Sequence, residues 1–293
     1  MRYQVDEEDI RLDSYLTKKT SESRSQVVKM IKSDEVLVNG KVTKAGYILK
    51  KDDIIEVNHL KKDESILPEE MDLDIVYEDD DVIVVNKANG VVVHPAPGNY
   101  HGTLVNGLLY HTKLSDLNGE VRPGIVHRID AYTTGLLMVA KNNKAHEFLA
   151  GELSSKKAYR KYIALVWGNI KNDSGTIDAP IGRSLTDRKK MAVLATGKPA
   201  ITHFKVLKRF KDATLIELRL ETGRTHQIRV HMEYIGHPVV NDPVYGNRKL
   251  VDDSGQCLHA KTLGFVHPKT LKYMEFDSEL PECFLNVLNK FEE

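Results

Sequence analysis

The segment PGIVHRIDAYTTGLLMVAK, residues 123–141, places three polar side chains, His127, Arg128 and Asp130, directly before an apolar run. The Thr-Thr-Gly turn signal and the apolar run that follows it indicate a buried strand. A single aspartate at such a point often only caps the turn through its own hydrogen bonds. It can also project into a cleft, where a carboxylate serves as a nucleophile or a general base. Asp130 is therefore a candidate catalytic residue.

Two further segments carry side chains that suit a reaction at this carboxylate. In ETGRTHQIRVH, Arg224 and Arg229 follow a strand-to-helix turn. An arginine opposite an aspartate keeps the carboxylate ionised, as a nucleophile or base requires. In YRKYIALVWG, Tyr162 stands at the head of an apolar strand, where its ring either packs in the core or stacks on a nucleobase.

Several other chemistries do not fit the sequence. His226 and His231 are five residues apart, about 140° around a helix, whereas the zinc-protease pattern needs a spacing of four on one face. Neither a phosphate-binding glycine loop nor a Gly-x-Ser-x-Gly nucleophile motif occurs. Cys257 and Cys283 are the only cysteines, which excludes a disulfide framework and a four-cysteine zinc site. We therefore expect no bound metal.

The 293 residues are enough for two domains, and we predict a small domain at 1–62, a linker at 63–75 and a large domain at 76–293. The formal net charge is zero, so a surface that binds nucleic acid must be local. The N-terminus has no apolar signal core, and no apolar run is long enough to cross a membrane. We accordingly expect a cytoplasmic protein with no membrane contact.

The small domain has the pattern of two helices, a hairpin and a further strand. The helices are predicted at 11–19 and 23–35, and Asn39-Gly40 lies between alternating apolar residues, a strong hairpin signal. This order resembles the S-four type of RNA-binding module, in which a basic helix contacts RNA phosphates. The alternative is a solvated helix face. The basic residues assigned to RNA contact are Lys18, Lys19, Arg24, Lys29 and Lys32.

The large domain alternates strand-like and helix-like segments, and several strands follow one another directly. That order predicts an α+β fold with a mixed, largely antiparallel sheet. Strands are predicted at 82–87, 135–141, 161–168, 202–210, 213–223, 258–268 and 274–280, and helices at 102–111, 142–153 and 225–237.

Four motifs in this order make the chain recognisable. They are VVNK with GVVVHPAPG, GIVHRID with TTGLLMVAK, RKYIALVWG, and ETGRTHQIRVHMEYIGHPVVNDPVYG. Together with the N-terminal module they resemble the RNA pseudouridine synthases of the RluA/RluD type, over nearly the whole chain. The resemblance implies the pseudouridine synthase fold and the isomerisation of uridine without any cofactor.

The resemblance also implies roles for individual residues. Asp130 matches the essential aspartate of the family, and Arg229 matches the basic residue that pairs with it. Tyr162 matches the tyrosine that stacks on the uracil, and Ile228 an apolar residue of the base pocket. Arg128 matches an arginine that fills the gap left when the uridine flips out of its helix.

The same motifs add His127, Thr134 and Arg224 to the expected substrate-binding residues, Arg224 as a scaffold or phosphate contact. The carboxylate can add to the anomeric carbon, or it can remove a sugar proton so that the base leaves a glycal. The sequence leaves both mechanisms open.

The chain departs from the family pattern at three places. Ala131-Tyr132 replaces a usual Lys-Asp pair, Ala88 a usual proline, and Asn241 a usual glycine. None of these removes a predicted catalytic residue, although the first directly follows Asp130.

The expected substrate is large-subunit ribosomal RNA, free or in an assembling large ribosomal subunit, with the protein acting as a monomer. The alternatives are a synthase that acts on tRNA and a non-catalytic RNA-binding or ribosome-assembly protein. The presence of both Asp130 and Arg229 favours an active enzyme.

Overall fold

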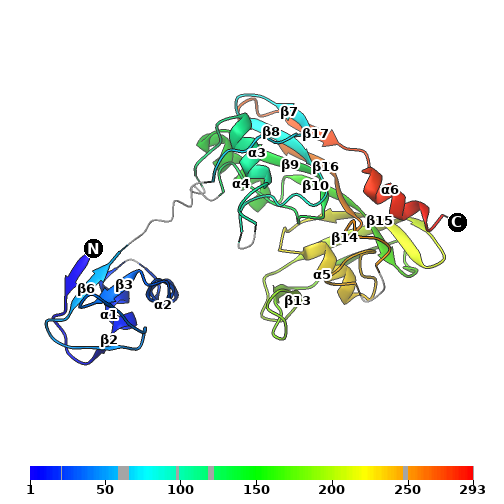
Figure 1. Ribbon diagram of the computed structural model, residues 1–293. Helices are drawn as coiled ribbons and strands as arrows, with labels where there is room; N and C mark the ends of the chain where they lie inside the picture. Colours follow the sequence, from blue (N-terminus) through cyan, green and yellow to red (C-terminus); the bar gives the residue numbers. More distant parts are fainter. Residues whose placement is uncertain (21, 59–65, 97–98, 118–121, 247–249, 293) are drawn as a thin grey trace. The chain divides into compact units, whose positions relative to one another are not determined.

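The chain forms two compact units, Met1–Glu64 and Ser65–Glu293 (Figure 1). The structure, a computed structural model, describes all residues except 21, 59–65, 97–98, 118–121, 247–249 and 293. The first unit contains β1 (Arg2–Gln4), β2 (Ile10–Arg11), α1 (Leu12–Lys19), α2 (Arg24–Lys32), β3 (Val36–Val38), β4 (Lys41–Val42), β5 (Ile48–Leu49) and β6 (Ile54–Val57).

The two helices and the hairpin predicted for the first unit are present in the structure. Ser23 caps α2 with a capping box, its hydroxyl accepting from the backbone N–H of Gln26. Asn39 and Gly40 have φ values of 51° and 74°, the left-handed pair that a tight β3–β4 hairpin requires. The sequence analysis missed the short strands β1, β2 and β5, of which β1 pairs with β6 and β2 with β5.

The predicted linker at 63–75 is wrong over most of its length. Residues 63–65 lie outside the described part of the chain, but residues 66–75 belong to the second unit. Ile66 and Leu73 pack against its core, and Asn106 holds this segment through bonds to the backbone of Leu67 and Glu69. Because the segment is rich in acidic residues, its sequence did not indicate that Ile66 and Leu73 pack against the core.

The second unit is built on one long sheet in the order β11-β14-β15-β10-β16-β9-β8-β7, with β17 beside β16. Every pair in it is antiparallel except β16 with β9, which confirms an α+β fold with a mixed, largely antiparallel sheet. Its elements are β7 (Ile75–Glu78), β8 (Val82–Lys87), α3 (Leu104–His111), β9 (Thr134–Ala140), α4 (Asn143–Ser154), β10 (Tyr159–Trp167), β11 (Ser174–Asp178), β12 (Ile181–Arg183), β13 (Met191–Val193), β14 (Ile201–Arg209), β15 (Ala213–Leu220), α5 (Gln227–Tyr234), β16 (Leu258–Val266), β17 (Tyr273–Asp277) and α6 (Glu282–Asn289).

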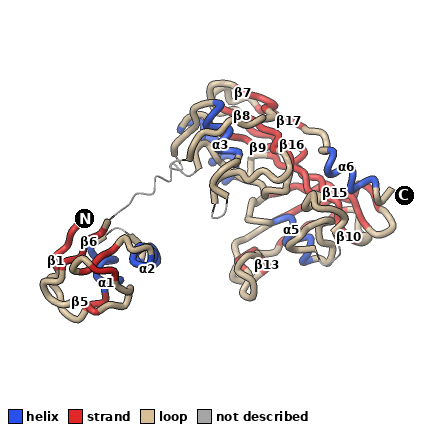
Figure 2. The backbone as a smooth tube through the Cα atoms, viewed as in Figure 1, coloured by secondary structure: helices blue, strands red, loops and turns tan. Residues whose placement is uncertain are grey.

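The short helices lie on the strands of this sheet (Figure 2). Along β8, Ile83 and Val85 join one core cluster together with Leu108 of α3. Val82 and Val84, which face the opposite way, join another cluster that includes residues of α4. Both faces of β8 are therefore buried, which explains why its sequence is continuously apolar.

The single parallel pairing brings β9 against β16. Gly135 lies there with a φ of 107°, and a Cβ at this position would stand 2.3 Å from the carbonyl oxygen of Ala260. Only glycine permits so close an approach of the two strands. The pairing fixes the start of β9 and therefore the loop that carries Asp130.

The sequence did not predict β7, β11, β12, β13 or α6, and the four strands among them are only three to five residues long. None of the helices in the described part of the chain is long and apolar enough to span a membrane.

Candidate active site

The three residues predicted to be catalytic line one pocket of about 380 Å³ in the second unit. Asp130 comes from the loop before β9, Tyr162 from β10 and Arg229 from α5. These residues are far apart in the sequence, and the long sheet brings them together.

Arg229 joins Asp130 to a second, buried carboxylate. Its Nη1 donates to Oδ2 of Asp130 at 2.9 Å, while its Nε and Nη2 donate to the two oxygens of Asp242 at 2.7 and 2.9 Å. Burial opposes the charge of Arg229, but its hydrogen bonds to Asp242 and the negative charge of Asp130 raise its pKa above the usual value. Arg229 therefore stays charged and orients the carboxylate of Asp130.

Asp242 fixes the opposite side of this arginine. Its Oδ1 also accepts from the backbone N–H groups of Val244 and Tyr245, so the carboxylate cannot rotate. Burial opposes its ionisation, but the hydrogen bond and charge of Arg229, together with the two backbone N–H donors, outweigh burial and lower the pKa of Asp242. The sequence analysis missed Asp242, although it lies in the NDPVYG motif that carried the resemblance.

His226 faces the other oxygen of Asp130. Its Nε2 lies 3.8 Å from Oδ1 of Asp130, and its Nδ1 lies 2.8 Å from the hydroxyl of Tyr245. That hydroxyl accepts from the N–H of Met191 and carries a proton of its own that Nδ1 can accept. Burial lowers the pKa of His226, although the charge of Asp130 opposes this. In the tautomer whose Nδ1 accepts from this hydroxyl, the neutral ring presents an N–H at Nε2 toward Asp130.

Tyr162 and Ile228 form the apolar part of the pocket. Both are almost fully buried, at 6% and 4% exposure, and both belong to the largest core cluster. Burial raises the pKa of Tyr162, so its phenol stays protonated at neutral pH. A planar apolar surface thus lies beside the carboxylate.

Two of the predicted substrate-binding arginines lie at the rim of the pocket. Arg128 is exposed and donates to the hydroxyl of Thr225, and Arg224 donates through Nε to the carbonyl of Pro199. Each keeps further N–H groups for a ligand.

His127 and Thr134 are engaged within the protein. His127 lines the pocket, but its Nε2 accepts from the backbone N–H of Met138, and burial lowers its pKa to about 3. Thr134 is buried and bonds through its hydroxyl to Nδ1 of His259. Both contacts fix β9, and the start of β9 in turn positions Asp130.

Lys87 holds the loop after Asp130 through a hydrogen bond to its backbone. Its buried ammonium donates to the carbonyls of Ala88, Val91 and Ala131, the last at 2.7 Å. Burial lowers the pKa of Lys87 to about 7, and the charge of Asp130 opposes this. The sequence analysis quoted this lysine only as part of a motif.

Asn241 explains one departure from the family pattern. Its φ of 64° lies in the left-handed region, which glycine adopts freely and asparagine tolerates. Its amide also bonds to Asp252, Ser254 and Gly255, and a Cβ on that glycine would touch Tyr132. The asparagine thus fastens the loop that packs beside the departure at Ala131-Tyr132.

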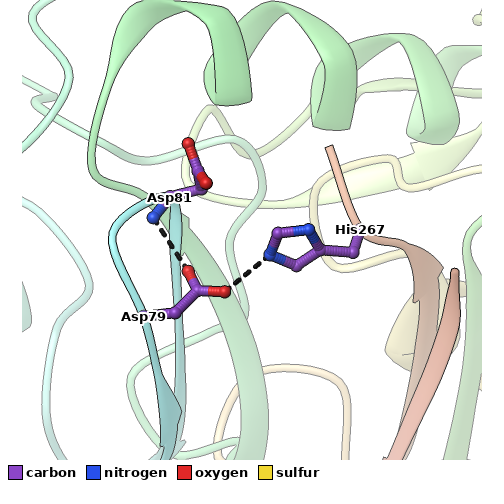
Figure 3. Close-up of side chains that lie close together, drawn as sticks. All are labelled: Asp79, Asp81 and His267. Carbon is purple, nitrogen blue, oxygen red and sulfur yellow. Dashed lines mark hydrogen bonds and ion pairs between the residues drawn. The ribbon is translucent and has the colours of Figure 1, made fainter. Parts of the chain in front are cut away.

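Asp79, Asp81 and His267 form the one cluster with metal-ligand spacing in the described part of the chain (Figure 3). Asp79 already accepts four hydrogen bonds, from Tyr77, the backbone of Asp81 and Val82, and Nε2 of His267 at 2.6 Å. Nδ1 of His267 accepts from two backbone N–H groups. These hydrogen bonds give the cluster a structural role, because they hold the turn between β7 and β8 in place.

The five basic residues assigned to the first unit differ in their partners. Lys18 pairs with Glu7, Lys19 with Asp6, and Arg24 with the buried Asp13, which Arg11 also contacts. Lys29 and Lys32 are exposed on α2, and no ion pair in the described part of the chain includes them. Of these five residues, Lys29 and Lys32 are therefore the two that an anion can reach without displacing an acid.

Comparison with known proteins agrees with this site. Residues 81–234 match the family described as RNA pseudouridylate synthase, and residues 10–55 match the S4 domain. A relative from Bacillus subtilis, named an uncharacterized RNA pseudouridine synthase, is 55% identical over 95% of this chain and 93% of its own length. The chain belongs to the RNA pseudouridylate synthase family.

Other members of the family support the same assignment. Ribosomal large subunit pseudouridine synthase D of Pseudomonas aeruginosa is 44% identical, over 91% of this chain and 87% of the relative. The structure of human RNA pseudouridylate synthase domain containing 1 is 26% identical, with a TM-score of 0.58 over 75% of this chain and 95% of the human one. The predicted family, fold and isomerase activity are confirmed, and this synthase acts on RNA.

Proposed function

We propose that this pseudouridine synthase modifies large-subunit ribosomal RNA in the cytoplasm and acts as a monomer. The RNA class is supported by relatives, including those of Pseudomonas aeruginosa and Zymomonas mobilis, that are named for the ribosomal large subunit. The monomer is supported by the site itself, because one chain supplies Asp130, Tyr162 and Arg229.

The observation that carries the mechanism is the bond from Arg229 to Asp130 at 2.9 Å, at the wall of a pocket that Tyr162 also lines. Asp130 acts on the ribose of the target uridine. It either adds to C1′ or removes a proton from C2′, and in both cases the bond from C1′ to N1 of the uracil breaks. Arg229 fixes the carboxylate and keeps one oxygen of Asp130 directed into the pocket.

Tyr162 and Ile228 hold the uracil while it turns to present C5 to C1′. Both are buried and apolar toward the pocket, which suits a planar base during this rotation. The uridine must leave its helix to reach them. Arg128 is exposed at the rim, where it occupies the place that the flipped base vacates.

Release of tritium tests this function. Transcripts of large-subunit rRNA, small-subunit rRNA and tRNA carry tritium at C5 of uridine and are incubated with wild type, Asp130→Asn and the control Asp72→Asn. Asp72 is exposed and lies outside the pocket. We expect release from the large-subunit transcript by wild type and Asp72→Asn, and none by Asp130→Asn.

Other outcomes would correct separate parts of the proposal. Release from tRNA alone would refute the ribosomal substrate and leave the mechanism standing. Release by Asp130→Asn above a few per cent of the wild-type rate would refute the role given to the carboxylate.

A further inference from the structure

Arg160 lies in the wall of the same pocket, and neither the motifs nor the family resemblance gave it a role. It lies on β10 two residues before Tyr162, and both side chains are buried, Arg160 at 7% exposure. Alternate residues of a strand face the same side, about 7 Å apart along it. The guanidinium and the phenol ring therefore enter the pocket from one face of β10.

This guanidinium has no counter-ion among the residues that the structure describes. Its Nε is buried without a hydrogen-bond partner, and no ion pair among the described residues includes Arg160. Asp130, which lines the pocket, and Asp242, which does not, are both engaged by Arg229. A buried cation without a partner destabilises a fold, so its retention calls for a ligand that supplies negative charge.

The protein leaves room for this cation beside the pocket. A Cβ on Gly223 would stand 2.8 Å from Nη1 of Arg160, so glycine allows the guanidinium to lie against the turn before α5. The charge of Arg160 acts on the side chains of His127 and Tyr162. Burial lowers the pKa of His127, and the charge of Arg160 lowers it further. Burial raises the pKa of Tyr162, and the charge of Arg160 opposes this rise.

We propose that the Arg160 guanidinium donates hydrogen bonds to a carbonyl oxygen of the target uracil and stabilises the anion that this base becomes. The inference rests on the proposed function. When the C1′–N1 bond breaks, its electron pair stays with the uracil, and the charge is shared among N1, O2 and O4. Asp130 meanwhile bonds to C1′, or takes the C2′ proton and later returns it.

The uracil anion is consumed when C5 bonds to C1′. C5 then loses its proton and N1 gains one, so that the overall reaction is an isomerisation. Arg160 stays protonated throughout and moves no proton itself. Because its charge is fixed before the bond breaks, it favours the anion over the neutral base in the way an oxyanion hole does.

A phosphodiester of the RNA is the other anion that could meet this arginine, and burial argues against it. Base flipping inserts the base and leaves the backbone near the rim. The rim already offers the exposed Arg128 and the half-buried Arg224. Arg160 lies as deep as Tyr162, where a base edge fits and a phosphate would have to enter the pocket.

The test compares Arg160→Met and Arg160→Lys with the control Arg219→Gln, an exposed arginine on β15. Single-turnover tritium release from the labelled large-subunit transcript gives the chemical rate. Removal of one such donor typically lowers the rate about 100-fold, so we expect at least this loss for Arg160→Met. Arg160→Lys should retain part of the rate, and Arg219→Gln should match wild type.

Binding and stability measurements separate the possible roles of Arg160. RNA affinity, measured in an Asp130→Asn background to prevent turnover, should change less than threefold with Arg160→Met. A loss of affinity as large as the loss of rate, with a shallower salt dependence, would assign Arg160 to a phosphate and overturn the inference. A melting temperature of Arg160→Met well below that of wild type would also overturn the inference. It would show that Arg160 stabilises the fold.

The proposed function is judged apart from this result. Release by wild type and none by Asp130→Asn establishes the function whatever Arg160 does. An undiminished rate in Arg160→Met then refutes the role of Arg160 alone.

Discussion

Replacing Asp242 by asparagine should disturb both the fold and the catalytic carboxylate. Asp242 is 1% exposed and binds Arg229 through both of its oxygens. In Asp242→Asn the remaining oxygen stays with the backbone N–H groups of Val244 and Tyr245. The new amide nitrogen then faces Nε of Arg229. Two hydrogen-bond donors thus oppose each other in place of a charge-assisted hydrogen bond.

The magnitude follows from what is lost. Removing one partner of a buried ion pair costs about 3–5 kcal/mol, which in a domain of this size lowers the melting temperature by about 10 °C. Of its two carboxylate partners Arg229 then keeps only Asp130, and misplacement by about 1 Å costs about 100-fold in rate. Urea unfolding and single-turnover tritium release measure the two effects, with Asp72→Asn as the control.

One result would refute this reasoning. If Asp242→Asn unfolds within 1 kcal/mol of wild type and turns over at the same rate, Arg229 does not depend on Asp242 for its position. A loss of stability with an unchanged rate would mean that the bond to Asp130 alone orients Arg229.

Three further predictions follow from other contacts. Asn241→Ala should be less stable than Asn241→Gly by about 1 kcal/mol in urea unfolding, because alanine is strained at a φ of 64° and glycine is not; equal stabilities would contradict this. His259 is neutral in the fold because burial lowers its pKa to about 4, so protonation of the unfolded chain near pH 6.5 destabilises the protein as the pH falls toward 4. Between pH 6.5 and 5 wild type should lose up to about 2 kcal/mol more than His259→Gln, and parallel pH curves would exclude this histidine as a cause. Replacing Lys29 and Lys32 together by glutamine should reduce the salt slope of RNA binding by about 2, whereas Lys18→Gln, whose lysine is paired with Glu7, should change it less; equal effects would show that these ion pairs open on RNA.

The sequence predicted the regular elements well wherever periodicity and turn signals agree. The hairpin at Asn39-Gly40 is a local feature, and the structure has it. The predicted linker failed because its acidic composition outweighed a few apolar residues, such as Leu73, whose partners lie on a distant helix.

The residues of the site also differ in how far the sequence could predict them. Asp130, Tyr162 and Arg229 could be named because motifs carry them, and the structure brings them into one pocket. Asp242 and Arg160 could not be named, because a buried counter-ion and an unpaired cation are defined only by their surroundings. For Arg160 a signal was present, since its spacing of two from Tyr162 on an apolar strand already places both on one face.

The parallel pairing of β9 with β16 has a consequence for the order in which the enzyme is made. It joins Thr134 to His259, 125 residues later, and the bond from Arg229 to Asp130 spans 99 residues. Closing such long loops is slow compared with forming local hairpins and helices. A nascent chain on the ribosome thus carries a folded N-terminal module well before residue 259 has been synthesised. The chain can hold RNA before it can modify RNA.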